Sequence, residues 1–92
     1  MPMIDVRCAP AAGGWTCDVT VDDGVGRPTA HVVTVAAADL ARFAPEATDP
    51  KDLLTRSFEF LLEREPKSSI LRRFDLRVIA RYFPEYERTI RG

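Results

Sequence analysis

Two segments in which apolar and polar residues alternate lie on either side of a glycine-containing turn, and they constrain the fold more than any other part of the chain. Residues 4–8 and 15–21 both alternate, as strands with one buried face do. One antiparallel register matches all the apolar positions, through the pairs Cys8 with Cys17, Val6 with Val19 and Ile4 with Val21. Because a slip by one residue would move every side chain to the other face, the pattern predicts a hairpin with this register.

A third strand is expected after a second turn. Residues 22–28 contain two glycines and a proline, and residues 29–35 follow with Val33 and Val35 on the inward side. The opposite face is polar, and the hairpin register places Arg7 across from Asp18 on it. Since a polar face can remain in water, helices need to cover only one face of the sheet. We therefore predict an α+β fold built on a three-stranded antiparallel β-meander, at about residues 3–8, 15–22 and 29–35.

Helices are expected after this sheet and packed on its apolar face, at about residues 38–43, 50–65, 69–74 and 76–90. Asp49 is placed to cap the second of them, with Pro50 at its first position. Apolar residues cover roughly 200° of that helix, which is wider than the stripe of a surface helix, so we expect it to be buried on two sides. Ser57 lies within this arc, where a small side chain would permit close approach to the sheet.

The segment after Pro66 is harder to assign. Residues 69–74 form a short turn or helix, and Asp75 can cap a further helix that begins at Leu76. Apolar residues keep one helical phase across Pro84, so either a kinked helix runs to about residue 90 or Pro84 starts a new turn in nearly the same direction.

Size and composition indicate a single domain over residues 1–92. The apolar fraction of 46% and charged fraction of 29% are those of an ordinary globular chain rather than a disordered one. Two cysteines are too few for a secreted disulfide scaffold. The first residues contain neither a basic segment nor an apolar run, and no stretch is long and apolar enough to span a bilayer. We therefore expect a cytoplasmic protein that makes no membrane contact.

Five short segments also carry a resemblance. HVVTV at residues 31–35, SFEFLLEREP at 57–66, IL at 70–71, FDL at 74–76 and RYFPEY at 81–86 resemble a group of short uncharacterised bacterial proteins. The likeness extends over about two thirds of the chain. It implies a bacterial cytoplasmic protein, but it implies no activity, cofactor or binding residue.

Neither a metal site nor a catalytic site is predicted. The only soft metal ligands are Cys8, Cys17 and His31, and their spacing does not suit a four-ligand zinc site. We expect two buried thiols side by side, because a disulfide is disfavoured in a reducing cytoplasm, and a histidine near a strand end. His31 has no nucleophile at a motif spacing, and the carboxylates Glu59 and Glu63 share a face that should be in water. The chain is thus expected to be non-catalytic, with no cofactor.

The remaining candidate is an interaction surface near the C-terminus. Residues 1–65 carry a net charge of −5 and residues 66–92 carry +4, so the two halves complement each other within one chain or between two. The candidate residues are Arg77, Arg81, Arg88, Tyr82 and Tyr86. We favour a protein–protein interaction or regulatory module, with self-association into a homodimer as one form of it. The alternative is a nucleic-acid-binding regulator in which the arginines contact phosphates, and a pI of about 5.8 makes it the weaker of the two.

Overall fold

The predicted hairpin is present in the structure, a computed structural model that describes residues 2–91. It consists of β1 (Met3–Ala11) and β2 (Gly14–Asp22), with Cys8 opposite Cys17 and Arg7 opposite Asp18, which confirms the register. The turn occupies two residues, and Gly13 within it has φ of 76°, a left-handed conformation that favours glycine. The strands are longer than predicted because the pairing continues up to this turn.

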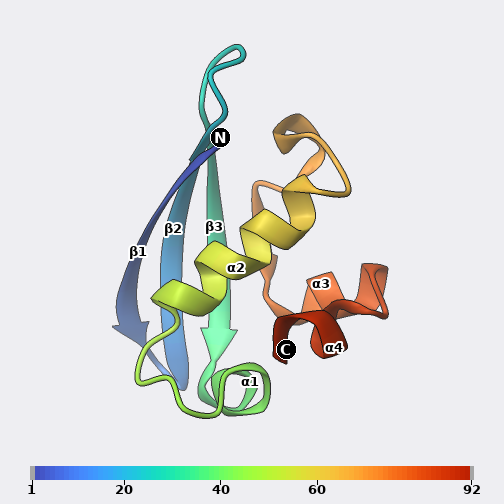
Figure 1. Cartoon of the computed structure of the whole chain (residues 1–92). Coiled ribbons are helices and arrows are strands. Elements are labelled where there is room, and N and C mark those ends of the chain that lie inside the picture. Colours follow the sequence, from blue (N-terminus) through green and yellow to red (C-terminus); the bar gives the residue numbers. More distant parts are fainter. Residues whose placement is uncertain (1, 92) are drawn as a thin grey trace.

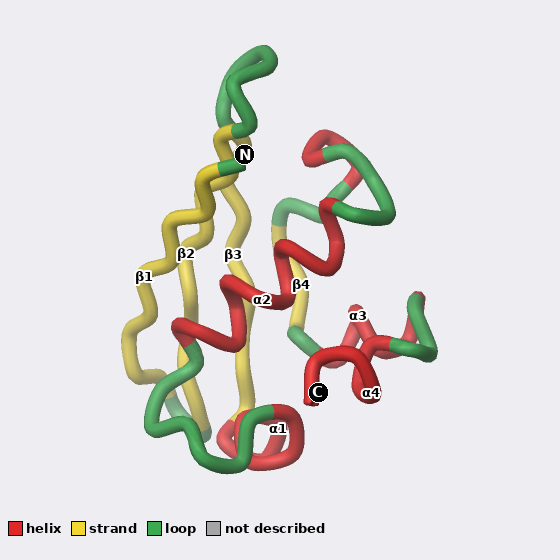
Figure 2. The backbone as a smooth tube through the Cα atoms, viewed as in Figure 1, coloured by secondary structure: helices red, strands yellow, loops and turns green. Residues whose placement is uncertain are grey.

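The sheet contains a fourth strand that the sequence did not predict. β3 (Thr29–Ala36) completes the meander, and β4 (Arg73–Asp75) pairs parallel to β3 with Phe74 opposite Val33. The strand order is β1-β2-β3-β4; Figure 1 labels the first three strands and Figure 2 labels β4 as well. The prediction of a turn or helix over residues 69–74 is therefore wrong: a 3-10 turn at Lys67–Ser69 precedes the strand. A three-residue strand is too short to show an alternating pattern, and its partner lies 41 positions earlier in the sequence.

Helices are packed on this sheet, as predicted, and the longest of them lies across one face of it (Figure 2). They are α1 (Ala37–Phe43), α2 (Lys51–Leu62), α3 (Arg77–Tyr82) and α4 (Tyr86–Arg91). The Asp49 carboxylate accepts a hydrogen bond from the Lys51 main-chain N–H at 2.9 Å, but the N-cap position is occupied by Pro50, one residue later than predicted, and Lys51 is the first residue of α2. The helix ends at Leu62, earlier than predicted, where the N–H groups of Arg64 and Glu65 both bond to the carbonyl of Leu61 and close the last turn.

The last predicted helix is divided in two. α3 begins after Asp75, whose carboxylate accepts a hydrogen bond from the Arg77 main-chain N–H at 3.1 Å. It ends at Tyr82, and Pro84, which has no N–H to continue a helix, lies before α4. Because the two helices are separate, a helical phase counted across Pro84 does not place the residues of α3 and α4 on one face.

The core lies between the sheet and the helices. Phe58, Leu61 and Ile79 are among its buried residues. The apolar residues of α2 are almost all covered by the same chain, since α2 packs on β1 on one side and on α4 on the other. The wide apolar arc therefore reflects burial on two sides within one molecule, and it leaves little of this helix for a partner. None of the helices among residues 2–91 has the length and apolar character needed to cross a bilayer.

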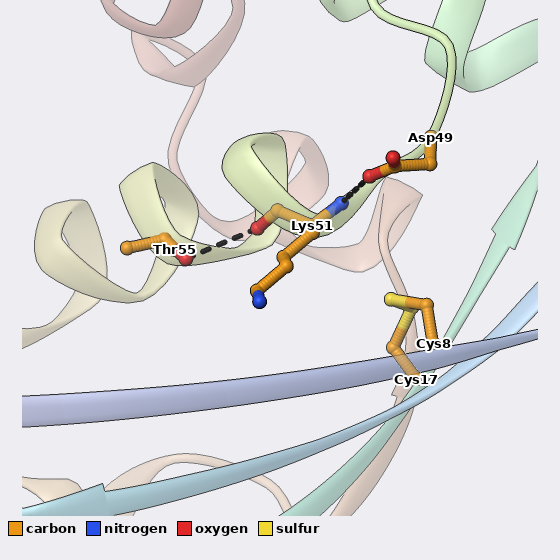
Figure 3. The surroundings of a disulfide bond; sticks show 5 residues. All are labelled: Cys8, Cys17, Asp49, Lys51 and Thr55. Atoms are coloured by element: carbon orange, nitrogen blue, oxygen red, sulfur yellow. Dashed lines mark hydrogen bonds between the residues drawn. A yellow bond between two sulfur atoms is a disulfide. The ribbon is translucent and has the colours of Figure 1, made fainter.

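Two local predictions need correction. Cys8 and Cys17 are joined in a disulfide (Figure 3), whereas we expected free thiols. Directly opposed residues on adjacent strands are close enough to form this bond, and here their Cα atoms are 4.0 Å apart. Ser57 does not serve an approach to the sheet. Its hydroxyl is hydrogen-bonded to the hydroxyl of Tyr86 in α4 at 2.7 Å and donates to the carbonyl of Leu53 at 2.7 Å.

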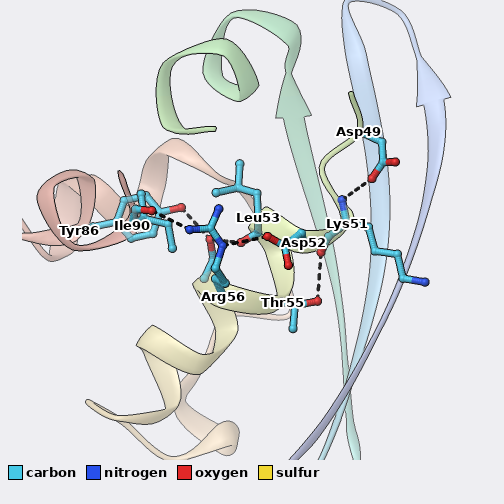
Figure 4. A network of polar contacts seen from close by, with 9 residues as sticks. Asp49, Lys51, Asp52, Leu53, Thr55, Arg56, Tyr86 and Ile90 are labelled. Atoms are coloured by element: carbon cyan, nitrogen blue, oxygen red, sulfur yellow. Dashed lines mark hydrogen bonds and ion pairs between the residues drawn. The ribbon is translucent and has the colours of Figure 1, made fainter. Parts of the chain in front are cut away.

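Arg56 joins α2 to the end of α4 (Figure 4). Its guanidinium donates to the Asp52 carboxylate at 3.0 Å, the pair predicted from their four-residue spacing, and to the carbonyl of Ile90 at 2.8 Å. The latter bond satisfies a main-chain acceptor in the last turn of α4.

Candidate functional site

Arg77 is exposed at the surface, but its guanidinium is paired with carboxylates of the same chain. Its guanidinium donates to the Asp75 carboxylate at 3.0 Å and lies 3.7 Å from the Asp39 carboxylate. Thr34 donates to the other oxygen of Asp75 at 2.8 Å. Although burial acts to raise the pKa of Asp75, the hydrogen bonds from Arg77 and Thr34 outweigh it and lower that pKa. Arg77 therefore connects α3 to β4 through Asp75 and to α1 through Asp39.

The ion pair between Arg77 and Asp39 has a further role. Asp39 is buried, and its Oδ2 is the one buried side-chain polar atom within residues 2–91 that lacks a hydrogen bond. A buried carboxylate is stabilised by a nearby cation even without a hydrogen bond. Asp39 lies in the acidic half of the chain and Arg77 in the basic half, and Lys67 likewise binds Asp23 at 2.6 Å. Part of the charge asymmetry is thus neutralised within the molecule.

Tyr86 is not part of any exposed surface. Its side chain is fully buried, with edge-to-face contacts to Phe43 and Phe60 at 5.3 Å between ring centroids. Burial raises the pKa of Tyr86 to about 12, although the hydrogen bond between Tyr86 and Ser57 acts in the opposite direction. The assignment of Tyr86 to the candidate surface is therefore wrong: the residue was included because it is close to the arginines in the sequence, but its side chain is buried.

The other three candidates are accessible. Tyr82 is 68% exposed, and Arg81 and Arg88 are exposed too. Neither arginine forms an ion pair or hydrogen bond with any residue in the described part of the chain. The structure therefore separates Arg77 and Tyr86, which stabilise the fold, from Arg81, Arg88 and Tyr82, which are free to contact another molecule.

Tyr82 lies at the rim of an apolar groove of about 350 Å³. The groove lies between the end of α2, the segment that leads into β4, and α3. Its walls are mostly apolar: Leu61, Ile70, Leu71, Phe74, Val78, Ile79, Tyr82 and Phe83, with Glu65 and Ser69 as the polar members. Leu71 is 49% exposed at the rim, which makes Leu71 and Tyr82 the two large exposed apolar side chains of the groove.

Leu71 was missed by sequence reasoning. Residues 69–74 were predicted to form a turn or helix, whereas the chain there leads into β4 with Ile70 and Phe74 buried and Leu71 exposed. An apolar residue followed by two arginines, Arg72 and Arg73, was the available signal. Arg72 and Arg73 are exposed and, like Arg81, form no ion pair with any residue from 2 to 91.

His31 supports the wall of the groove that carries Leu71. It is buried in β3 and stacks at a tilt on Phe58, 5.3 Å between ring centroids. Its Nδ1 lies 2.8 Å from the carbonyl of Leu71, and its Nε2 lies 2.8 Å from the hydroxyl of Thr29. Since a carbonyl only accepts, Nδ1 carries the proton of the neutral ring and Nε2 accepts from Thr29. Burial lowers the pKa of His31, with Arg72 contributing in the same direction.

Arg64 fixes the opposite wall. Its guanidinium lies over the ring of Phe60, 3.5 Å from the centroid, and donates to the Glu85 carboxylate at 3.2 Å. This contact connects the end of α2 to the turn that holds Phe83. Both walls of the groove are thus held by contacts to the core, so the groove is formed before any ligand arrives.

A second hollow, of about 620 Å³, lies between the α1–α2 loop and the end of α4. It is wider and more polar, and Asp52, Arg56 and Arg91 line it. Arg56 is engaged with Asp52 and Ile90, and Arg91 with Glu87. Its charged groups are therefore largely paired with one another.

The described residues contain no group of three or more histidine, cysteine or acidic side chains that could hold a metal ion. The two cysteines are bonded to each other, and both nitrogens of His31 are hydrogen-bonded. Comparisons with protein-family models, curated proteins and solved structures found no match to this chain. The resemblance to short bacterial proteins thus stays a prediction, and the geometry of the groove is the basis for a functional proposal.

Proposed function

We propose that this protein is a non-catalytic protein–protein interaction module that binds an acidic segment of a partner, with an apolar side chain of that segment seated in the groove. The observation that carries the proposal is the preformed apolar groove with Leu71 and Tyr82 exposed at its rim. Exposed apolar side chains that adjoin a groove are typical of interaction sites. Tyrosine is also among the residues that contribute most to binding energy at interfaces.

The charge around the groove supports the choice of an acidic partner. Arg72 adjoins Leu71 and Arg81 adjoins Tyr82, and both guanidinium groups are exposed without an ion-pair partner among residues 2–91. Glu65 is the single carboxylate among the lining residues. Unpaired cations at a rim attract carboxylates and accelerate association. The lining residues include no nucleophile paired with a base, so the groove offers recognition rather than catalysis.

Nucleic-acid binding remains the second proposal. Arg72, Arg73, Arg81 and Arg88 are exposed and unpaired within the described residues, which favours contact with phosphates. It ranks lower because Tyr86 is buried and because the guanidinium of Arg77, although exposed, is already paired with the carboxylates of Asp75 and Asp39. Acidic residues elsewhere give the chain a net charge of −1.

The cytoplasmic location is also a proposal, and the Cys8–Cys17 bond provides its test. Disulfides rarely persist in a reducing cytoplasm. Cys17 is buried, so thiols must be alkylated after rapid acid quenching and denaturation of the cells. Mass spectrometry should then find both cysteines alkylated if the protein is cytoplasmic. Protection of both cysteines would place the chain in an oxidising compartment instead.

Photo-crosslinking tests the groove in the full chain. A benzoylphenylalanine at position 82 should form a discrete protein adduct in source cells, whereas the same group at position 25 should not. Val25 is the matched control because it is 72% exposed and apolar but is not a groove residue. A second change, Leu71→Glu, should remove the adduct from position 82.

A purified peptide from the crosslinked partner then gives the quantitative test. Leu71→Glu should weaken its binding by about tenfold or more, as expected for a central apolar contact, and Val25→Glu should leave binding unchanged. Equal adducts at positions 82 and 25, or equal effects of the two variants, would contradict the proposal. Submicromolar, salt-sensitive binding of a single-stranded oligonucleotide by the wild type would favour the nucleic-acid reading.

A further inference from the structure

The outer edge of β1 has features of a second, independent interaction surface. β1 is the first strand of the sheet, and no described strand pairs with its other side (Figure 1). A free edge presents main-chain N–H and C=O groups that can pair with another strand. The edge lies at the opposite side of the sheet from β4 and the groove, so the two surfaces can act separately.

The pairing of β2 with its neighbours β1 and β3 identifies the residues of β1 whose main-chain groups face the free edge. Ala37 N–H donates to the carbonyl of Gly13 at 2.9 Å, so odd-numbered residues of β2 direct their main-chain groups toward β3. Cys17 is one of these residues. Its Cα lies 4.0 Å from that of Cys8, the short spacing of a pair without mutual hydrogen bonds. Ile4, Val6 and Cys8 therefore direct their N–H and C=O groups away from β2, to the free edge.

The sequence of β1 is self-complementary about Val6. In an antiparallel pairing of two copies centred on Val6, each residue faces the one equally distant from Val6 on the other chain. Asp5 of the first copy then lies opposite Arg7 of the second copy, and Arg7 of the first copy lies opposite Asp5 of the second. Both side chains are exposed on the outer face, where their present contact is a 3.5 Å pair within one strand. A cross-strand pair of opposite charges contributes to the pairing, whereas like charges oppose it.

The inner face and the ends of the segment fit the same arrangement. Ile4 of one copy would face Cys8 of the other, and both are partly exposed at the edge of the core. Pro2 and Pro10 are equally distant from Val6, and neither has an N–H to donate. The two prolines thus limit the pairing to the residues between them, which opposes open-ended addition of further strands.

We propose that two copies of this chain associate through antiparallel pairing of their β1 strands, centred on Val6, to form one continuous eight-stranded sheet. Three residues of each copy supply the paired main-chain groups, so the contact is small and the dimer forms reversibly with concentration. The pairing uses a closed two-fold arrangement, because each copy has one free β1 edge and consumes it. This inference does not depend on the groove, and each can fail without the other.

Charge reversal at two positions tests the register. Asp5→Arg places arginine opposite arginine in its own dimer, and Arg7→Asp places aspartate opposite aspartate. We expect each variant alone to dimerise about tenfold more weakly than the wild type or worse. A mixture of the two should recover dimerisation, because arginines of one chain then face aspartates of the other at all four positions. Both residues are exposed, so neither change should unfold the monomer.

Sedimentation velocity over a wide concentration range, in the full chain, measures the outcome. The expected result is a concentration-dependent wild-type dimer, two weakened variants and recovery in their mixture. Leu71→Glu, at the groove, is the control and should dimerise like the wild type. A wild type that stays monomeric at the highest concentration, or variants that dimerise as well as the wild type, would overturn the proposal. Loss of dimerisation in Leu71→Glu would assign self-association to the groove instead.

Discussion

The hydrogen bond between Ser57 and Tyr86 leads to a prediction in which a second mutation restores stability. Both hydroxyls are buried, and they lie 2.7 Å apart. Since the Ser57 hydroxyl donates to the carbonyl of Leu53 at 2.7 Å, it accepts from Tyr86. The Ser57 oxygen is the only hydrogen-bond partner of the Tyr86 hydroxyl among the described residues.

The two single changes should therefore differ in cost. Ser57→Ala leaves the Tyr86 hydroxyl buried without an acceptor, which should lower the free energy of unfolding by about 1 to 3 kcal/mol. Tyr86→Phe removes the donor itself, and the Ser57 hydroxyl retains its bond to Leu53, so the loss should be about 0.5 to 1.5 kcal/mol. Adding Tyr86→Phe to Ser57→Ala removes the buried Tyr86 hydroxyl that has no acceptor. The double variant should therefore be more stable than Ser57→Ala alone.

Guanidinium chloride unfolding of the four proteins near neutral pH, followed by far-ultraviolet circular dichroism, measures the cycle. The dependence of the free energy on denaturant should be the same for all four, so that the midpoints report stability. The reasoning is refuted if Tyr86→Phe destabilises the Ser57→Ala protein as much as it destabilises the wild type. Such additivity would mean that the two hydroxyls do not interact in a buried site.

Three further predictions address the core, the histidine and the disulfide. Phe58→Ala should lower the free energy of unfolding by about 3 to 5 kcal/mol, because apolar burial is lost and a cavity is left. Chemical denaturation at low temperature should show this loss. An unshifted denaturation midpoint would contradict the burial of the Phe58 ring. His31 has a lowered pKa in the folded state. Above about pH 6.5 its ring is neutral in both the folded and the unfolded state. Below that pH the unfolded chain binds a proton more readily than the folded chain, so the free energy of unfolding should fall as the pH falls, by at most about 1.4 kcal/mol per pH unit. His31→Gln should remove this dependence if His31 is its source. Reduction of the Cys8–Cys17 bond, which closes a loop of sequence separation 9, should lower the free energy of unfolding by roughly 2 to 3 kcal/mol, and an unchanged denaturation midpoint with dithiothreitol would refute this.

The sequence predicted the elements whose signals are local. The hairpin register follows from period-two alternation on both sides of one turn, and it is correct at all the predicted pairs. Asp49 and Asp75 also accept hydrogen bonds from the first main-chain N–H groups of α2 and α3, although the N-cap positions are Pro50 and Leu76, one residue later than predicted. Each of these features depends on groups within a few residues of one another, so a single sequence contains the necessary information.

The candidate surface was predicted only in part. Tyr82, Arg81 and Arg88 are exposed as expected, but Tyr86 and Arg77 are engaged in the fold. Tyr86 was included because it is close to the arginines in the sequence, and closeness in sequence does not establish exposure. The ion pair of Arg77 with Asp39 joins residues that are far apart in the sequence, so no local pattern could predict it.

By itself, the sequence determined the α+β class, the meander and its register, and the burial of α2, because periodic burial and turn chemistry act over short distances along the chain. Only the tertiary structure decided that β4 pairs with β3 and that the groove opens beside Leu71. Both depend on contacts between residues some 40 positions apart, such as the bond from His31 to the carbonyl of Leu71. No local pattern encodes such contacts, since they form only when the helices have already brought distant segments together over one face of the sheet.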